Sequence, residues 1–214
     1  KLDPKVTSLY PGFFCGYALV TGLTVETSVE ALEGKVRELV ESYRGREGAL
    51  EGLLPYMEFL KRMGVEETSF PLKLWMERIL KGEFPGRNNN VLDSCVLASL
   101  EHLVPLSPFD LLKLKGEVEV TLSAGDRPLI LQDGSKVVPP AGEVILRDQE
   151  RILSSYSRGE GTVARVGFET SGVIFVAWNA PGIPRQKVEE VLKAVATYAR
   201  RYCGGHVEKT EVLG

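Results

Sequence analysis

The spacing of hydrophobic residues changes once along this chain, and that change limits what the chain can fold into. Between about residues 27 and 103, apolar side chains recur every three or four positions, which is the pattern of helices that bury one face. From Glu117 to Leu122, apolar and polar residues alternate instead, as in a half-buried strand. Helices first and many short strands later predict an α+β fold rather than alternating βαβ units.

The same patterns give approximate bounds for each element. Thr27 and Ser69 are expected to cap helices, with Glu30 completing a capping box, and Gly64 is expected to end a helix. The residues after Gly204 fit either an edge strand or a frayed tail. The predicted helices span about residues 27–43, 50–63, 69–82, 92–103 and 184–202. The predicted strands lie within 13–25 and at 117–122, 129–131, 136–138, 144–147, 151–155, 163–166 and 173–178.

The chain length suits one large domain or two small ones that share a core, since it has 214 residues. No internal repeat and no clear linker is visible in the sequence. We therefore expect residues 1–214 to form a single unit. In it, a helical lead with an N-terminal strand, residues 1–82, packs onto a core formed by residues 83–214.

Charge and cysteine content exclude several classes of function. The net charge of -3 and the pI near 5.6 lack the basic excess of dedicated nucleic-acid binders, so any RNA contact must come from a local patch. Three widely separated cysteines argue against a disulfide framework, and two histidines without a CxxC pair argue against a zinc site. We expect no metal and no other cofactor.

Neither the first residues nor any apolar run indicates a membrane protein. The N-terminus lacks a charged region followed by an apolar signal segment. No apolar run approaches the roughly 18 residues that a membrane span needs. The expectation is a cytoplasmic location with no membrane partner.

The stretch Pro85–Asp110 has the most distinctive local pattern of the chain. The triplet Asn88–Asn90 comes just before a predicted helix, and asparagine either forms turns or presents its amide to a polar site. Asp93 and Ser94 fall in the first turn, where the helix dipole favours negative charge. The stretch is therefore either one wall of a pocket or an ordinary core helix with a polar loop before it.

Residues between about 69 and 184 occur in an order that is typical of one family. They are Leu80, Lys81, Gly82, Pro85, Asp93, Leu100, Glu101, Pro105, Phe109, Asp110, Gly116, Asp133, Gly134, Gly142, Glu143, Val144, Ile145, Asp148, Glu169 and Thr170. In this order the chain resembles the tRNA-editing module of the phenylalanyl-tRNA synthetase beta subunit, its B-three/B-four domain. It looks like the stand-alone form, in which helices and a short strand precede the module.

The resemblance implies both a fold and an activity. The implied fold is a central antiparallel β-sandwich of short strands flanked by amphipathic helices. The implied activity is hydrolysis of the ester that joins a wrong amino acid to the 3′ end of a tRNA, so the implied partner is that end of the tRNA and not DNA. In the synthetase the misplaced amino acid is tyrosine.

The chain departs from the family pattern at positions that matter for chemistry. Cys95 and Val96 stand where the synthetase has a threonine-asparagine pair, and Ser107 stands where it has a histidine. The family's glutamate that holds the tyrosine hydroxyl falls near Val176. A buried hydroxyl without a partner costs about 1–3 kcal/mol, so tyrosine is not the expected substrate.

An aminoacyl ester is already activated, so its hydrolysis needs a placed water and donors for the developing oxyanion. We expect these donors at the helix start, and the candidate catalytic residues are Asn90, Ser94 and Cys95. A rival interpretation makes Cys95 a thiolate nucleophile at a helix N-terminus. His102 lies seven residues further on, about 10 Å along a helix, which is too far for a direct hydrogen bond.

The single-stranded end of a tRNA needs a stacking surface and backbone contacts. Tyr156, Trp178 and Arg158 are candidates, although plain core packing is the alternative for Trp178. A basic stripe at Arg147, Arg151, Arg158 and Arg165 is the other possible contact, with solvated strand ends as its alternative. The candidate substrate-binding residues are Asn88, Asn89, Asp93, Ser107, Tyr156, Arg158, Thr170, Val176 and Trp178.

Two hypotheses for the function follow. The first is a trans-acting aminoacyl-tRNA deacylase, a hydrolase of an ester bond that needs no metal. The second is a non-catalytic module that binds tRNA or an amino acid and has lost the editing residues. Gly45–Gly48 lacks the lysine of a phosphate-binding loop, and Gly159–Gly161 is interpreted as a turn between strands.

Overall fold

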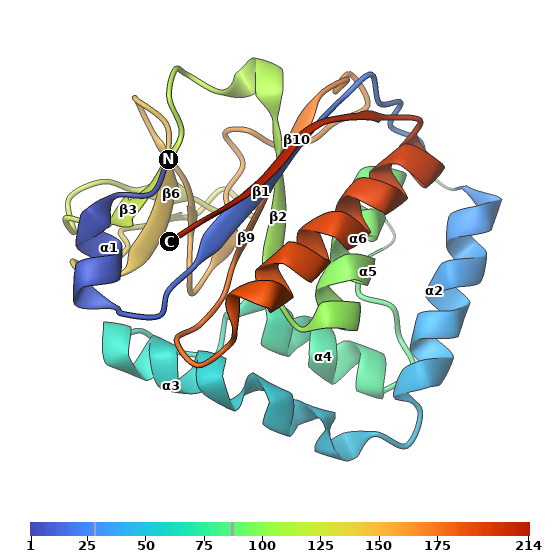
Figure 1. Ribbon diagram of the computed structural model, residues 1–214, viewed down its shortest axis with the longest axis horizontal. Coiled ribbons are helices and arrows are strands. Elements are labelled where there is room, and N and C mark those ends of the chain that lie inside the picture. Colours follow the sequence, from blue (N-terminus) through green and yellow to red (C-terminus); the bar gives the residue numbers. More distant parts are fainter. Residues whose placement is uncertain (28, 87) are drawn as a thin grey trace.

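The computed structural model describes residues 1–27, 29–86 and 88–214. Its first sheet has four antiparallel strands in the order β10-β1-β9-β2, so strands from both ends of the chain lie side by side (Figure 1). The C-terminal residues form an edge strand and not a frayed tail. The strands are β1 (Cys15–Thr21), β2 (Leu106–Asp110), β9 (Val173–Trp178) and β10 (His206–Leu213).

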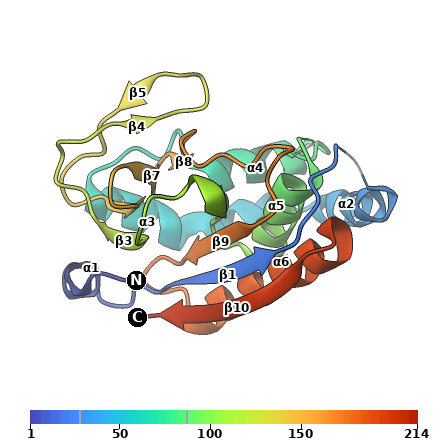
Figure 2. The same ribbon diagram turned by 90° about the horizontal axis from the view of Figure 1, so that it is seen from above.

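A second sheet has four antiparallel strands in the order β3-β6-β7-β8, and a hairpin of two short strands packs its Leu129 against Ile145 and Ile152 of this sheet (Figure 2). The second sheet holds β3 (Glu119–Leu122), β6 (Val144–Arg147), β7 (Ile152–Ser155) and β8 (Gly159–Glu160). The hairpin pairs β4 (Leu129–Ile130) with β5 (Lys136–Val137). The α+β class and the central antiparallel sandwich are therefore confirmed.

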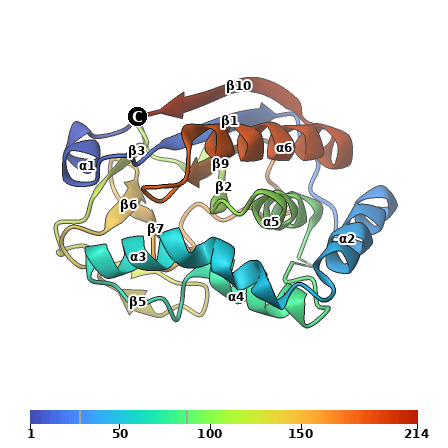
Figure 3. The same cartoon turned by 60° about the horizontal axis from the view of Figure 1, so that its bottom comes forward.

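Helices flank the sheets, and one of them lies in the middle of the others. Helix α5 packs against α6, α2, α4 and β2, and Figure 3 shows it between α6 and α4. Because it has neighbours on every side, ten of its side chains are buried. The helices are α1 (Pro4–Leu9), α2 (Glu30–Tyr43), α3 (Leu54–Met63), α4 (Pro71–Leu80), α5 (Asn90–His102) and α6 (Arg185–Cys203), with 3-10 turns η1 (Glu47–Leu53) and η2 (Leu111–Lys113).

The main hydrophobic cluster draws side chains from both the lead and the core segments. Phe59 and Phe70 of the lead contact Tyr156 of the core, with ring centroids 5.0 and 5.9 Å away. Each such side chain contributes roughly 1.5–3 kcal/mol when it leaves water. The division of the chain at residue 82 remains a prediction.

Several local predictions were wrong. Helix α2 begins after Val29 and α4 after Phe70, and neither start carries a side-chain cap, so the caps assigned to Thr27 and Ser69 are incorrect. Residues 163–166 form no strand. Strand β2 was not predicted because it contains Pro108; it lies at the edge of its sheet, where a missing N–H costs no ladder hydrogen bond.

Candidate functional site

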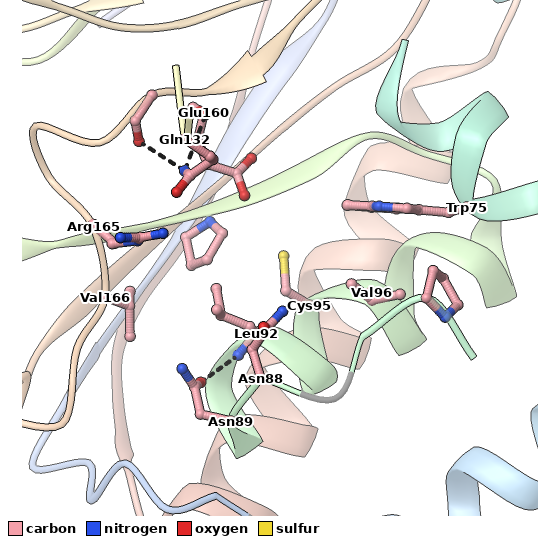
Figure 4. Close-up of a pocket in the computed structure, with 13 residues that line it drawn as sticks. Trp75, Asn88, Asn89, Leu92, Cys95, Val96, Gln132, Glu160, Arg165 and Val166 are labelled. Carbon is pink, nitrogen blue, oxygen red and sulfur yellow. Dashed lines mark hydrogen bonds between the residues drawn. The ribbon is translucent and has the colours of Figure 1, made fainter. Parts of the chain in front are cut away.

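A cavity of about 470 Å³ opens beside the N-terminal end of α5. One wall comes from the α5 start and the loop before it, and the other comes from β8, the β4–β5 loop and the segment after β8 (Figure 4). The α5 wall consists of Asn88, Asn89, Leu92, Cys95 and Val96. The opposite wall consists of Gln132, Glu160, Gly161, Arg165 and Val166, and Trp75, Pro85 and Pro108 complete the lining.

The α5 wall is set by the capping of the helix. Asn89 is the N-cap residue, and its Oδ1 accepts a hydrogen bond from the N–H of Leu92 at 2.9 Å. The backbone N–H of Asn88 donates to Oδ1 of Asp93 at 3.3 Å, so this buried carboxylate holds the loop and does not line the cavity. An added Cβ on Gly86 would lie 2.4 Å from the same oxygen, which explains the glycine there.

The backbone N–H groups of the first turn of α5 are already taken. Asn90 N donates to the carbonyl of Glu26, and Asp93 N donates to the carbonyl of Asn89, both at 2.9 Å. Val91 N donates to Oδ1 of Asn90 at 3.1 Å. Backbone donors at the helix start are therefore not available to a ligand, contrary to the expectation from sequence, and the donors on this wall must be side-chain amides.

The opposite wall carries a carboxylate that the sequence had not indicated. Oε2 of Glu160 accepts a hydrogen bond from Oγ of Ser107 at 2.8 Å. Nε2 of Gln132 lies 3.5 and 3.4 Å from the carbonyls of Glu160 and Gly161. Burial raises the pKa of Glu160, and hydrogen bonds from its own backbone and from Ser107 lower it in part. Such a perturbed carboxyl group in a cavity is typical of functional sites.

The raised pKa of Glu160 predicts how stability depends on pH. Because the folded state holds this proton more tightly than the unfolded chain, Glu160 costs stability as the pH rises from its ordinary pKa of 4.5 through the raised value. We expect Glu160→Gln to unfold at a higher temperature than the wild type at pH 8 and to match it at pH 4. Each kcal/mol corresponds to about 2–4 °C in a chain of this size.

Thermal unfolding followed by circular dichroism at both pH values measures this difference. Glu51→Gln is the matched control, because Glu51 is exposed and distant in sequence from the cavity walls. A Glu160→Gln protein that is less stable than the wild type at pH 8 would contradict the prediction.

Cys95 lines the cavity, but its thiol is not set up as a nucleophile. Its Sγ donates to the carbonyl of Leu106 at 3.1 Å, and its side chain is buried. Burial raises the pKa of Cys95 well above its ordinary value, and the charge of Glu160 raises it further. His102 does not line the cavity; its Nδ1 lies 3.8 Å from Glu190. The thiolate interpretation therefore lacks support from the geometry.

Thiol reactivity of the native protein should accordingly be low. Cys15, Cys95 and Cys203 are all buried, and burial raises the pKa of each thiol. We expect an aromatic disulfide reagent to release almost no thiolate from the folded protein within minutes, and three equivalents in denaturant. Rapid release of one equivalent from the folded protein, lost in Cys95→Ser, would show a reactive thiol at the cavity.

The other two candidate catalytic residues face away from the cavity. Asn90 is fully buried, and its side chain bonds to backbone groups of Thr24 and Glu26 after β1 and of Tyr202 in α6. Ser94 is also buried, and its Oγ donates to the carbonyl of Asn90 at 2.6 Å. They occupy the opposite side of the helix start from Cys95 and Leu92, because successive helical residues differ by about 100° in direction.

The expected stacking residues lie inside the core. Tyr156 is 1% exposed, and its hydroxyl donates to the carbonyl of Asn179 at 2.6 Å. Trp178 is 6% exposed and stacks on Tyr156 with ring centroids 5.2 Å apart. Neither ring lines the cavity. Trp178 is therefore a packed core residue, which was the alternative interpretation of its role.

Three further candidates have structural contacts in this fold. Nη1 of the exposed Arg158 donates to Oγ of Ser69 at 3.0 Å. Oγ1 of Thr170 donates to Oδ2 of Asp110 at 2.6 Å, which fixes the loop after Arg165. Val176 lies in β9 opposite Ser107 and does not line the cavity.

Sequence reasoning did not assign Glu160, Gln132 or Trp75 to the site. The only signal for Glu160 was its place between two glycines. An added Cβ on Gly161 would lie 2.6 Å from the carbonyl of Ile130, so glycine lets this strand approach the hairpin. That requirement is visible only once the fold is known.

The structure of residues 1–27, 29–86 and 88–214 also bears on metal binding and on membrane insertion. No group of three or more histidine, cysteine, aspartate or glutamate side chains in these ranges is arranged to hold a metal ion. Among the helices described there, none has both the length and the apolar composition to cross a membrane.

Comparisons with known proteins agree with this architecture. The family model for the B3/4 domain matches residues 56–204. The phenylalanine–tRNA ligase beta subunit of Shewanella oneidensis is 31% identical over 109 residues, and that of Vibrio cholerae is 30% identical over 109 residues. Each match covers 50% of this chain and only 14% of the relative.

A solved structure agrees with the fold along the whole chain. An N-terminal fragment of the phenylalanyl-tRNA synthetase beta subunit from Pyrococcus horikoshii matches with a TM-score of 0.53 and 14% identity, over 100% of this chain and 53% of that one. At this identity the likeness shows the fold alone. The family model covers more than half of the chain, which confirms the resemblance seen in the sequence. The chain belongs to the B3/4 domain family, which it shares with the beta subunit of phenylalanyl-tRNA synthetase.

Proposed function

We propose that this protein is a trans-acting aminoacyl-tRNA deacylase, which hydrolyses the ester between a misplaced amino acid and the 3′ end of a tRNA. The observation that carries the proposal is the cavity beside α5, in a domain whose relatives are phenylalanine–tRNA ligase beta subunits. Its volume of about 470 Å³ lies within the range of small-molecule sites. The proposed reaction takes place in the cytoplasm.

The chemistry of the walls suits this reaction. An aminoacyl ester is activated, so a held water and donors for the oxyanion suffice. The amides of Asn88 and Asn89 are the side-chain donors of the α5 wall. Leu92, Val96 and Val166 give the cavity apolar surface that a side chain of the amino acid can contact. No step in this scheme needs the thiol of Cys95.

The proposal is tested by incubating the protein with a panel of mischarged tRNAs and measuring released amino acid. Release from at least one tRNA, faster than the spontaneous reaction, is expected. Binding without release would favour the second candidate, a non-catalytic tRNA- or amino-acid-binding module. If the protein neither binds a mischarged tRNA nor releases its amino acid, both candidate functions are contradicted.

A substitution at Asn89 separates catalysis from folding. Asn89→Ser keeps a side-chain oxygen that caps α5, since serine caps helices about as well as asparagine, but it removes the amide donor. We expect kcat for the active tRNA to fall by about 100-fold, as when one oxyanion donor is lost, with the unfolding midpoint nearly unchanged. Glu51→Gln again serves as control. An unchanged kcat would remove Asn89 from the reaction.

A further inference from the structure

Two opposite charges line the cavity without neutralising each other. Among the lining residues in the described ranges, Glu160 is the one carboxylate and Arg165 is the one cation. Neither of them takes part in an ion pair with any residue of 1–27, 29–86 or 88–214. Figure 4 shows both side chains on the wall that faces the α5 start. Unpaired opposite charges in one cavity suit a ligand that carries both signs.

One hydrogen bond from a neighbouring side chain holds the Glu160 carboxylate at the cavity wall. Its Oε2 accepts a hydrogen bond from Oγ of Ser107, and the carboxylate is also hydrogen-bonded by the backbone N–H of Glu160 itself. Ser107 belongs to β2 and Glu160 to β8, so the two sheets meet at this hydrogen bond. An ionised carboxylate can accept about four hydrogen bonds through its two oxygens. The Glu160 carboxylate, which lines the cavity, can therefore accept further hydrogen bonds from a ligand.

The proposed substrate has charges that match these two groups. An aminoacyl ester carries one cation, the α-ammonium next to the ester carbonyl, and the terminal nucleotide carries one anion, its 5′-phosphate. We infer that the Glu160 carboxylate binds the α-ammonium of the aminoacyl group, with Arg165 facing the phosphate. The site then accepts acyl groups with a free α-amino group and rejects acyl groups that lack it, such as N-blocked or peptidyl esters.

The charge state of Glu160 agrees with this role. Burial raises its pKa, and the hydrogen bonds from its own backbone N–H and from Ser107 offset this only in part. An ammonium group beside this carboxylate would favour the charged form and add up to three donors. The raised pKa reflects a buried carboxylate that a cationic ligand would stabilise.

The inference rests on the proposed function, and a binding experiment separates the two. The probes are 3′-alanylamino-3′-deoxyadenosine 5′-phosphate and its 3′-propionylamino analogue. Their amide bonds resist hydrolysis, and the two acyl groups have nearly the same size but differ by the ammonium group. Dissociation constants for both probes are measured by calorimetry with the full chain as wild type, Glu160→Gln and the control Glu51→Gln.

We expect the wild type and Glu51→Gln to bind the alanyl probe about 10- to 100-fold more tightly than the propionyl probe, the usual range for a hydrogen-bonded charge. In Glu160→Gln this preference should fall to about twofold or less. Equal binding by the wild type, a preference that survives in Glu160→Gln, or no binding of either probe would overturn the inference. If the protein prefers the alanyl probe but hydrolyses no mischarged tRNA, the result would support the inference about Glu160 and contradict only the proposed deacylase activity.

Discussion

Replacing Asn90 with alanine should lower the free energy of unfolding by about 3–5 kcal/mol, because it removes one side chain that satisfies four backbone groups. Its Oδ1 accepts from the N–H groups of Glu26 and Val91 at 2.8 and 3.1 Å. Its Nδ2 donates to the carbonyls of Thr24 and Tyr202 at 2.9 and 3.0 Å. The side chain is fully buried, so water cannot replace these bonds without a rearrangement.

The expected loss is large because Asn90 joins three segments that are distant in sequence. It links the segment after β1, the start of α5 and the last turn of α6. Each orphaned buried group costs about 1–3 kcal/mol, and partial relaxation keeps the sum below the simple total. Urea unfolding at neutral pH measures the difference.

Asn88→Ala is the matched control, since Asn88 is an exposed neighbour of the same residue type. Its removal should change the free energy of unfolding by less than about 0.5 kcal/mol. Equal stability of Asn90→Ala and Asn88→Ala would contradict the buried position of Asn90. If Asn90→Ala stayed folded and lost only deacylation, Asn90 would regain the catalytic role that its sequence position suggested.

The asparagine triplet shows why the sequence could locate the site but not assign its residues. Asn88 lines the cavity, Asn89 caps α5 at the cavity wall, and Asn90 points into the core. These three environments belong to identical residue types in consecutive positions. What distinguishes them is the rotation of the chain at the helix start, which depends on the loop before it and on packing against α6.

Strands with a strong local sequence pattern were predicted, whereas a strand without such a pattern was not. The segments Val144–Arg147 and Val173–Trp178 were predicted with the bounds that the structure has, because short runs rich in β-branched and aromatic residues are a local signal. Strand β8 has two residues, one of them glycine, and it pairs with β7. No local pattern marks such a strand, and Glu160, the only carboxylate among the described lining residues, was therefore missed.

The resemblance to the family indicated where a carboxylate was missing, but it did not indicate that Glu160 lies close by. The resemblance placed a missing carboxylate near Val176 and a missing histidine at Ser107. In the structure these two residues are direct partners across β2 and β9, and Oγ of Ser107 bonds to Glu160. The corner that the sequence described as lacking a carboxylate thus has one from another strand. Only the three-dimensional register brings Glu160 to that place.

Tyr156→Ala should cost about 3–5 kcal/mol of unfolding free energy, because it removes the ring at the centre of the aromatic core. Tyr156 meets Phe59 edge to face with centroids 5.0 Å apart, and it stacks on Phe70 and Trp178 at 5.9 and 5.2 Å. Its hydroxyl donates to the carbonyl of Asn179. Aromatic pairs of this kind add about 0.5–1.5 kcal/mol each beyond the buried area.

Tyr156→Phe separates this core role from a role in stacking on a nucleobase. It keeps the ring and removes one hydrogen bond, so we expect a loss of about 1–2 kcal/mol in urea unfolding. Its affinity for the alanyl probe should equal that of the wild type, because the ring is 1% exposed and does not line the cavity. If Tyr156→Ala instead kept wild-type stability and lost affinity for the probe, the ring would have to be accessible to the ligand, and the position of the site beside α5 would be wrong.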